Sequence, residues 1–309
     1  MKTRILFFVL IMATTFCHAQ QDAQYTQYMY NTININPAYA GSRDVLSMFG
    51  LYRTQWVGLR GAPDTKTFSI NAPITNSNLG VGLGVIADRI GPSDETNVAA
   101  DISYGFPISK NFKLSFGIKG SVNLLNVDFT KLDIFNAADP RFQTNIDNRF
   151  SPNIGAGFYL YSDKTYLGVS VPNFLETQHF DRNANTNSNS FIAKERLHYY
   201  VIAGHVFDLT DEIQFKPAAL FKIVGGAPLQ LDLSGNFMFR EKFLLGAAYR
   251  VNAAVSAMAG FQTSIGIFIG YGYDLETTSL RQFNSGSHEI FMRFELFRNY
   301  DKIIAPRFF

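Results

Sequence analysis

Residues 96–125 read TNVAADISYGFPISKNFKLSFGIKGSVNLL, and this stretch decides the fold. Apolar residues alternate with small or polar ones on both sides of a short turn at 107–111. Successive side chains of a strand point to opposite faces of a sheet, so each half has one apolar and one polar face. The polar face carries Asp101, Lys113 and Lys119, whereas the apolar face carries no Asp, Glu, Lys or Arg. The pattern predicts a hairpin with one face in an apolar environment.

A soluble β-sandwich would alternate in the same way, so length and composition decide between the two classes. Each half has about 10 residues or more, enough for a tilted strand to cross a bilayer core. Tyr104, Phe106 and Phe112 surround the turn, where an interfacial aromatic girdle would lie. Charged residues make up only 17% of the chain, below the roughly 25% of soluble domains, and aromatics reach 15%. These features favour a transmembrane β-barrel.

Similar alternating segments follow one another along the chain. We count fourteen, at 44–55, 65–73, 79–88, 96–106, 112–125, 152–161, 165–172, 196–208, 213–224, 229–239, 243–251, 254–261, 265–274 and 288–298. The connections after even-numbered segments are all short, while long ones, including 89–95, follow odd-numbered segments only. Outer-membrane barrels have this asymmetry and an even strand number. The fold class is therefore predicted as all-β, a transmembrane antiparallel barrel of about 14 strands at 43–298, in a Gram-negative outer membrane.

Three further segments flank the barrel. Residues 1–19 resemble a secretory signal peptide, with basic residues before an apolar run, and the only cysteine, Cys17, would leave with it. An acylated Cys17 is the alternative, which Phe16 disfavours because a small residue is wanted there. The aromatic and polar segment 20–42 is predicted to plug the lumen or cover the periplasmic mouth, and 299–309 is a C-terminal tail.

Charged side chains of both signs alternate onto the face opposite the apolar one. The balance of signs indicates internal pairing more than an ion-selective pore. This predicted lumenal network comprises Asp101, Lys113, Lys119, Lys216, Lys222, Asp232, Arg250, Glu289, Arg293 and Glu295, and Asp88 and Asp274 share its face. Glu289 and Glu295 are interpreted as partners of Arg293.

Two strands fit the pattern poorly. In the first, Arg53 shares its parity with Phe49 and Leu51, which leaves the register or extent of that strand open. In the ninth, Pro217 removes a backbone donor, which predicts a bulge or a break.

No motif indicates catalysis. Gly80, Gly82 and Gly84 resemble part of a dinucleotide loop, but they alternate within a strand and no helix follows. Glycines on an inward face leave room for a plug or for bulky neighbours. The histidines lack the spacing of metal ligands, and no nucleophile elbow is present. We expect no enzymatic activity, no metal and no cofactor.

Several short motifs together resemble the PorP/SprF family of the type IX secretion system of Bacteroidota. They include INPAYAGS at 35–42, YRTQWVG at 52–58, GAAYR at 246–250, GSHEI at 286–290 and PRFF at 306–309. The resemblance covers nearly the whole mature chain. The residues that we expect to bind a partner or form the plug are Tyr28, Asn36, Pro37, Tyr39, Gly41, Arg53, Trp56, Phe135 and Phe142.

The resemblance implies an outer-membrane barrel that supports export or surface attachment of adhesin-like cargo. Its expected partners are the C-terminal sorting domain of the cargo, outer-membrane lipid, and periplasmic components such as the PorK/PorN ring or a peptidoglycan-binding protein. Gliding motility is one setting for the family. No nucleic-acid partner is expected, since the net charge is only +2. Two alternatives stay open: a transporter for small or hydrophobic solutes with an N-terminal plug, and a structural tether to the cell wall.

Overall fold

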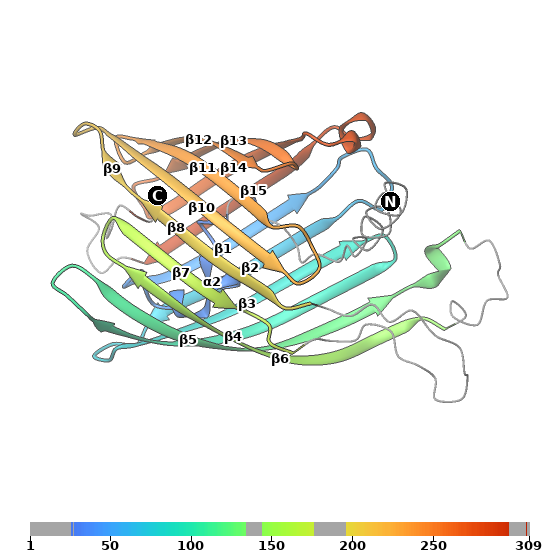
Figure 1. The fold of residues 1–309 in the computed structure, drawn as a ribbon, viewed down its shortest axis with the longest axis horizontal. Helices are drawn as coiled ribbons and strands as arrows, with labels where there is room; N and C mark the ends of the chain where they lie inside the picture. Colours follow the sequence, from blue (N-terminus) through green and yellow to red (C-terminus); the bar gives the residue numbers. More distant parts are fainter. Residues whose placement is uncertain (1–25, 27, 134–143, 176–195, 297–306, 308–309) are drawn as a thin grey trace, which may run out of the picture.

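The protein folds as a closed antiparallel β-barrel around a short internal segment (Figure 1). The computed structural model describes residues 26, 28–133, 144–175, 196–296 and 307. The predicted signal peptide at 1–19 and the candidate contact residues Phe135 and Phe142 lie outside the described residues. The predicted fold class is confirmed.

The wall consists of fourteen strands, because β8 and β9 are two parts of one strand interrupted at Val206. The strands are β1 (Leu46–Thr54), β2 (Asp64–Pro73), β3 (Leu79–Ile90), β4 (Ser93–Pro107), β5 (Lys113–Val127), β6 (Ile146–Tyr161), β7 (Thr165–Val171), β8 (His198–His205), β9 (Phe207–Asp208), β10 (Ile213–Val224), β11 (Gln230–Phe239), β12 (Phe243–Arg250), β13 (Ala254–Gln262), β14 (Ile267–Glu276) and β15 (Ser287–Leu296). The short helices are α2 (Thr32–Ile35), η1 (Pro37–Tyr39), η2 (Phe129–Lys131) and η4 (Ser279–Phe283). No helix in these described ranges is long and apolar enough to cross a membrane.

Closure of the sheet gives each of the fourteen strands a paired neighbour on both sides. β1 pairs with β15, from Leu46 opposite Leu296 to Thr54 opposite His288, and β10 pairs with β11. An unpaired amide costs several kcal/mol in hydrocarbon, so a spanning sheet cannot keep a free edge. The closed barrel is the arrangement that meets this requirement.

The β4–β5 hairpin has the orientation that its sequence predicts. Ile102 lies opposite Ile118 and both side chains are exposed on the outer surface, while Asp101 lies opposite Lys119 and both are buried inside. One predicted loop is shorter than expected. Residues 89–95 were predicted as a long connection, but β3 and β4 extend until only Gly91 and Pro92 join them.

The structure resolves both irregular strands. In β1, Phe49, Leu51 and Arg53 all face inward and are buried, which explains their shared parity. Phe49 stacks on Phe291 with ring centroids 5.4 Å apart, so apolar side chains on this inner face pack against others inside the barrel.

The register of β10 continues unchanged across Pro217. Ala218 lies opposite Gly204 and Phe215 opposite Phe207. The interruption therefore falls in the neighbouring strand, at Val206, whose amide donates to the carbonyl of Lys164 at 2.9 Å.

Candidate functional site

Residues 28–43, here called the lumenal segment, lie inside the barrel, and Figure 1 shows α2 within the ring of strands. Tyr28, Asn36, Pro37, Tyr39 and Gly41 are all buried there. The segment runs from the half of the barrel with the long connections, next to Thr26, to the half with the short turns, where β1 begins.

Polar side chains of the wall bind the main chain of the lumenal segment. The Lys119 ammonium donates to the carbonyls of Ile33 and Asn34 at 3.2 and 2.8 Å. In the opposite direction, the Asn36 side-chain amide donates from the segment to the Phe158 carbonyl of β6 at 2.9 Å. Two serines donate to further carbonyls of the segment, Ser103 to Ala40 at 2.7 Å and Ser170 to Ile35 at 2.6 Å. The bonds from Lys119, Ser103 and Ser170 satisfy carbonyls of the segment that its short helices leave without partners.

Glycines in the wall allow the lumenal segment to approach the backbone of the strands. A Cβ atom at Gly117 would lie well inside contact distance of the Ala38 backbone. A Cβ at Gly80 would collide in the same way with the Ala40 carbonyl, and one at Gly82 with the Ile33 side chain. The inward glycines at 80 and 82 therefore provide room for this segment and do not form a phosphate-binding loop.

Aromatic rings fill the space beside the segment. Tyr30 stacks on Phe268 and Phe291, with ring centroids 5.6 and 4.9 Å apart. Tyr39 packs edge-on against Tyr159 at 5.5 Å. All five side chains are buried, so this part of the interior resembles a protein core.

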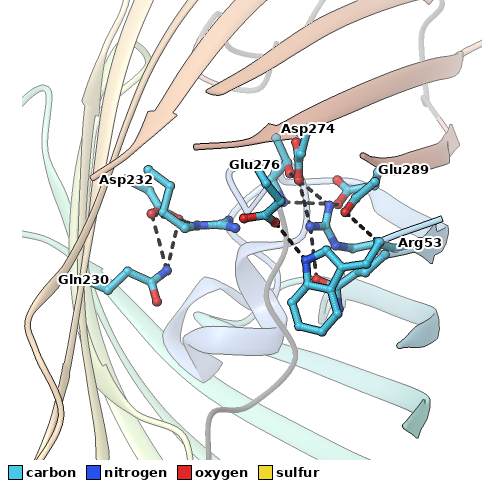
Figure 2. Close-up of polar contacts among 11 residues, drawn as sticks. Arg53, Gln230, Asp232, Asp274, Glu276 and Glu289 are labelled. Atoms are coloured by element: carbon cyan, nitrogen blue, oxygen red, sulfur yellow. Dashed lines mark hydrogen bonds and ion pairs between the residues drawn. The ribbon is translucent and has the colours of Figure 1, made fainter. Parts of the chain in front are cut away.

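A cluster around Arg53 binds Thr26, just before the first residue of the lumenal segment (Figure 2). The Arg53 guanidinium lies 2.7 Å from Asp274 and 3.0 Å from Glu289, and all three side chains are almost fully buried. It also donates to the Thr26 hydroxyl at 3.0 Å, while the Thr26 hydroxyl donates to Asp274. The Thr26 amide donates to Glu289 at 3.1 Å. Glu289 was predicted to pair with Arg293; it pairs with Arg53 instead, because β1 and β15 are neighbours and place them opposite each other.

A second cluster, around Glu295, binds Arg43 at the other end of the lumenal segment. Arg43 forms an ion pair with Glu295, and Arg293 lies 3.3 Å from the same carboxylate. The Arg43 guanidinium also donates to the Tyr39 hydroxyl at 3.1 Å. Glu295 therefore pairs with two arginines. Its predicted pairing with Arg293 is confirmed, and the pairing with Arg43 was not predicted.

The other predicted lumenal charges fall into separate groups. Asp101 and Lys119 are 3.7 Å apart. Arg250 binds Asp232 at 3.0 Å, and Gln230 binds the same carboxylate, as Figure 2 shows for Gln230 and Asp232.

The three remaining predicted lysines have different surroundings. The Lys216 and Lys222 ammonium groups are buried over the rings of Tyr30 and Tyr200, at 5.1 and 5.9 Å. Lys113 is half-exposed and lies 3.8 Å from Asp44, so it is not part of the buried network.

Trp56 lies in the β1–β2 connection. Its indole donates to Glu276 at 2.9 Å and its amide to the Ser287 hydroxyl at 3.1 Å. The neighbouring Val57 exchanges backbone bonds with Ser285 and Gly286. Trp56 therefore ties two connections together at the mouth that carries the long loops.

Sequence reasoning missed Thr26, Arg43 and Arg307. Each lies outside the alternating strands, so no period-two pattern marks it, and only the tertiary structure brings it to the lumen. Among the described residues, no group of three or more His, Cys, Asp or Glu side chains could hold a metal ion.

Comparisons with known proteins give a family and several similar folds. The family described as "Type IX secretion system membrane protein PorP/SprF" matches residues 17–294. No curated protein matches the sequence significantly.

Similar solved structures are barrels at low identity. The CymD monoaromatic hydrocarbon channel is 13% identical, with 88% of this chain and 93% of that chain covered and a TM-score of 0.49. The Pseudomonas putida toluene transporter TodX is 9% identical, with coverages of 89% and 98% and a TM-score of 0.49. A Pseudomonas aeruginosa FadL homologue is 12% identical, with coverages of 87% and 93% and a TM-score of 0.48. The family match, which spans most of the chain, and the closed barrel together give the assignment: the protein belongs to the PorP/SprF family of type IX secretion system membrane proteins and is an outer-membrane β-barrel.

Proposed function

We propose that this barrel supports export or cell-surface anchoring of an adhesin-like cargo, as a docking anchor and not as the export pore. Its proposed partner is the C-terminal sorting domain of the cargo. On the periplasmic side, we propose contact with other type IX components, such as the PorK/PorN ring or a peptidoglycan-binding protein. Gliding motility is a proposed setting, and the role is non-enzymatic.

The observation that carries this proposal is the filled lumen. The lumenal segment approaches the wall closely enough that glycines are required at Gly80 and Gly117. Lys119 of the wall donates a hydrogen bond to the segment, and Asn36 of the segment donates one to the wall. Aromatic rings pack beside the segment. The diameter of a barrel grows with its number of strands, and the lumen of a fourteen-stranded barrel is narrow. A folded adhesin domain therefore has no route through it while this segment is in place. The cargo would therefore engage the outer loops or a mouth of the barrel.

The filled lumen supports a transporter for small or hydrophobic solutes less well than an anchor. The transporter alternative predicts a lateral opening in the wall near Pro217. The pairing of β10 with β11 runs without a break past Pro217, and on the other side β8 and β9 keep one register with β10 on either side of the interruption at 216–217. This leaves the anchor as the role that the structure supports best.

Deletion of the gene tests the proposal. We expect the cargo to disappear from the cell surface, measured by antibody binding to intact cells, and to return when the wild-type gene is restored. Cargo retained in the periplasm would indicate a role in export, and cargo released to the medium would indicate a role in anchoring. An unchanged surface level of every protein that carries a sorting domain would contradict the proposal.

A pulldown tests the partner directly. The tagged barrel should retain a reporter fused to a cargo sorting domain. The matched controls are the reporter without that domain and an unrelated outer-membrane barrel used as bait. Equal retention of the two reporters would argue against recognition of the sorting domain.

A further inference from the structure

The pairing of β1 with β15, here called the seam, differs from the other pairings of the wall. Its ladder runs from Leu46 opposite Leu296 to Thr54 opposite His288. All other neighbouring strands also follow each other along the chain, so a single turn or loop connects them. β1 and β15 meet only by closing a loop that contains the rest of the wall, which costs more chain entropy than closing a short turn. The seam therefore gains most from contacts that hold it from elsewhere.

The N-terminal part of the chain covers most of the inner face of β15. The inward-facing residues of this stretch are Glu289, Phe291, Arg293 and Glu295. The Thr26 amide donates to the first carboxylate at 3.1 Å. The Tyr30 ring covers the two middle residues, with its centroid 4.9 Å from that of the phenylalanine and 5.9 Å from the guanidinium carbon. Arg43 forms an ion pair with the second carboxylate.

The same N-terminal residues also contact the strands on either side of β15. Arg53 of β1 donates to the Thr26 hydroxyl at 3.0 Å, and this hydroxyl donates to Asp274 of β14 (Figure 2). Tyr30 stacks on Phe268 of β14 with ring centroids 5.6 Å apart. Side-chain contacts inside the barrel thus connect β14, β15 and β1 across the seam.

The middle of the lumenal segment is bound to strands that lie away from the seam. Lys119 of β5 donates to the Asn34 carbonyl at 2.8 Å, and Ser170 of β7 donates to the Ile35 carbonyl at 2.6 Å. β4 and β5 are joined by a short turn, and such a hairpin forms from contacts that are local in sequence. The segment therefore has a base on strands that can pair before the barrel closes, and it reaches from this base to the seam.

We propose that Thr26 and the lumenal segment form a clamp that closes the barrel. The clamp holds β15 beside β1 from inside, and the seam is the ladder that opens first when the clamp is weakened. The segment thereby acts in the assembly and integrity of the wall, besides filling the lumen. This inference does not depend on the proposed cargo.

Hydrogen–deuterium exchange of the backbone amides tests the clamp in the purified barrel in detergent. Tyr30→Leu removes the ring that stacks on Phe268 and Phe291. Stacked aromatic pairs stabilise by more than the area that they bury, so we expect the amides of β1 and β15 to exchange about tenfold faster than in the wild type. The amides of β4 and β5, away from the seam, should exchange at wild-type rates.

Two matched variants make this measurement specific. Tyr30→Phe keeps the ring, so the amides of β1 and β15 should exchange as in the wild type. Tyr166→Leu removes a buried ring of β7, which stacks on Tyr159 of β6 with centroids 6.1 Å apart. Because neither of these strands borders the seam, Tyr166→Leu should leave the exchange of β1 and β15 unchanged.

Wild-type exchange of β1 and β15 in the Tyr30→Leu protein would overturn the proposal. So would an equal rise in β4 and β5, or an equal effect of Tyr166→Leu on the seam, because either result means a general loss of packing. If Tyr30→Leu gives no folded barrel on heat-modifiability gels, Thr26→Val decides the question, since it keeps the shape and removes the hydroxyl between Arg53 and Asp274. Faster exchange at the seam alone then supports the clamp, and wild-type exchange rejects it.

Discussion

Replacement of Arg53 by methionine should destabilise the barrel more than any surface substitution. Arg53 lies between two buried carboxylates, 2.7 Å from Asp274 and 3.0 Å from Glu289. It is also 3.0 Å from the Thr26 hydroxyl and 3.3 Å from the Gln55 side-chain oxygen. Methionine keeps most of the volume but provides neither charge nor donor.

The expected loss follows from the burial of the cluster. Removal of one partner from a buried ion pair costs about 3–5 kcal/mol, because the remaining charge is left without compensation. Two carboxylates remain here, so we expect Arg53→Met to lower the free energy of unfolding by about 5 kcal/mol, at the upper end of that range. The assay is denaturant unfolding of the purified protein in lipid or detergent. The fluorescence of Trp56, the only tryptophan, reports the transition close to the cluster.

Two matched variants make the test specific. Lys66→Met removes an exposed lysine 3.6 Å from Asp64, and should cost less than about 1 kcal/mol. The triple variant Arg53→Met, Asp274→Asn, Glu289→Gln removes all the charges together and should recover most of the loss, since a neutral replacement of a buried ion cluster is often tolerated. A loss below about 1 kcal/mol in Arg53→Met, or no recovery in the triple variant, would refute the reasoning.

Three further substitutions probe the lumen and the outer surface. Gly117→Leu should displace the lumenal segment at Ala38 and increase conductance in planar bilayers, whereas Gly120→Leu, where a Cβ would meet nothing within 4 Å, should conduct like the wild type. Lys119→Met removes two hydrogen bonds to carbonyls of the lumenal segment and should raise the protease sensitivity of that segment without opening the barrel; equal sensitivity to wild type would count against this contact. Ile102→Arg places a base on the outer surface of β4 and should lower the free energy of unfolding by about 2–4 kcal/mol, the cost of a base near the bilayer midplane. The assay is unfolding in lipid vesicles, and Ile102→Leu is the neutral comparison.

The strand pattern could be predicted because lipid imposes a strict rule on one face. Ile102 and Ile118 alternate with Asp101 and Lys119 in the sequence, and the structure places the first pair outside and the second inside. The fourteen segments emerged from the same alternation. The ends of the strands could not be predicted from this alternation. The 89–95 connection is shorter than predicted because the lipid does not fix how far strands continue beyond the membrane.

The interior could be predicted only in part, because it follows no such rule. Phe49, Phe268 and Phe291 face inward because they pack against one another and Tyr30 inside the barrel, and hydropathy alone does not show this. The partner of Glu289 depends on which strand lies beside β15, which is known only once the sheet closes at β1. Arg307 reaches the lumen from outside the alternating strands, where the sequence gives no signal for contact.

The conductance of the purified wild-type protein in a planar bilayer tests the filled lumen most directly. With the lumenal segment bonded to the wall by Lys119 and Asn36 and paired with Glu295 through Arg43, we expect no stable, large channel under any polarity of the applied voltage. A large conductance that stays open in the folded protein would contradict both the filled lumen and the anchor role built on it.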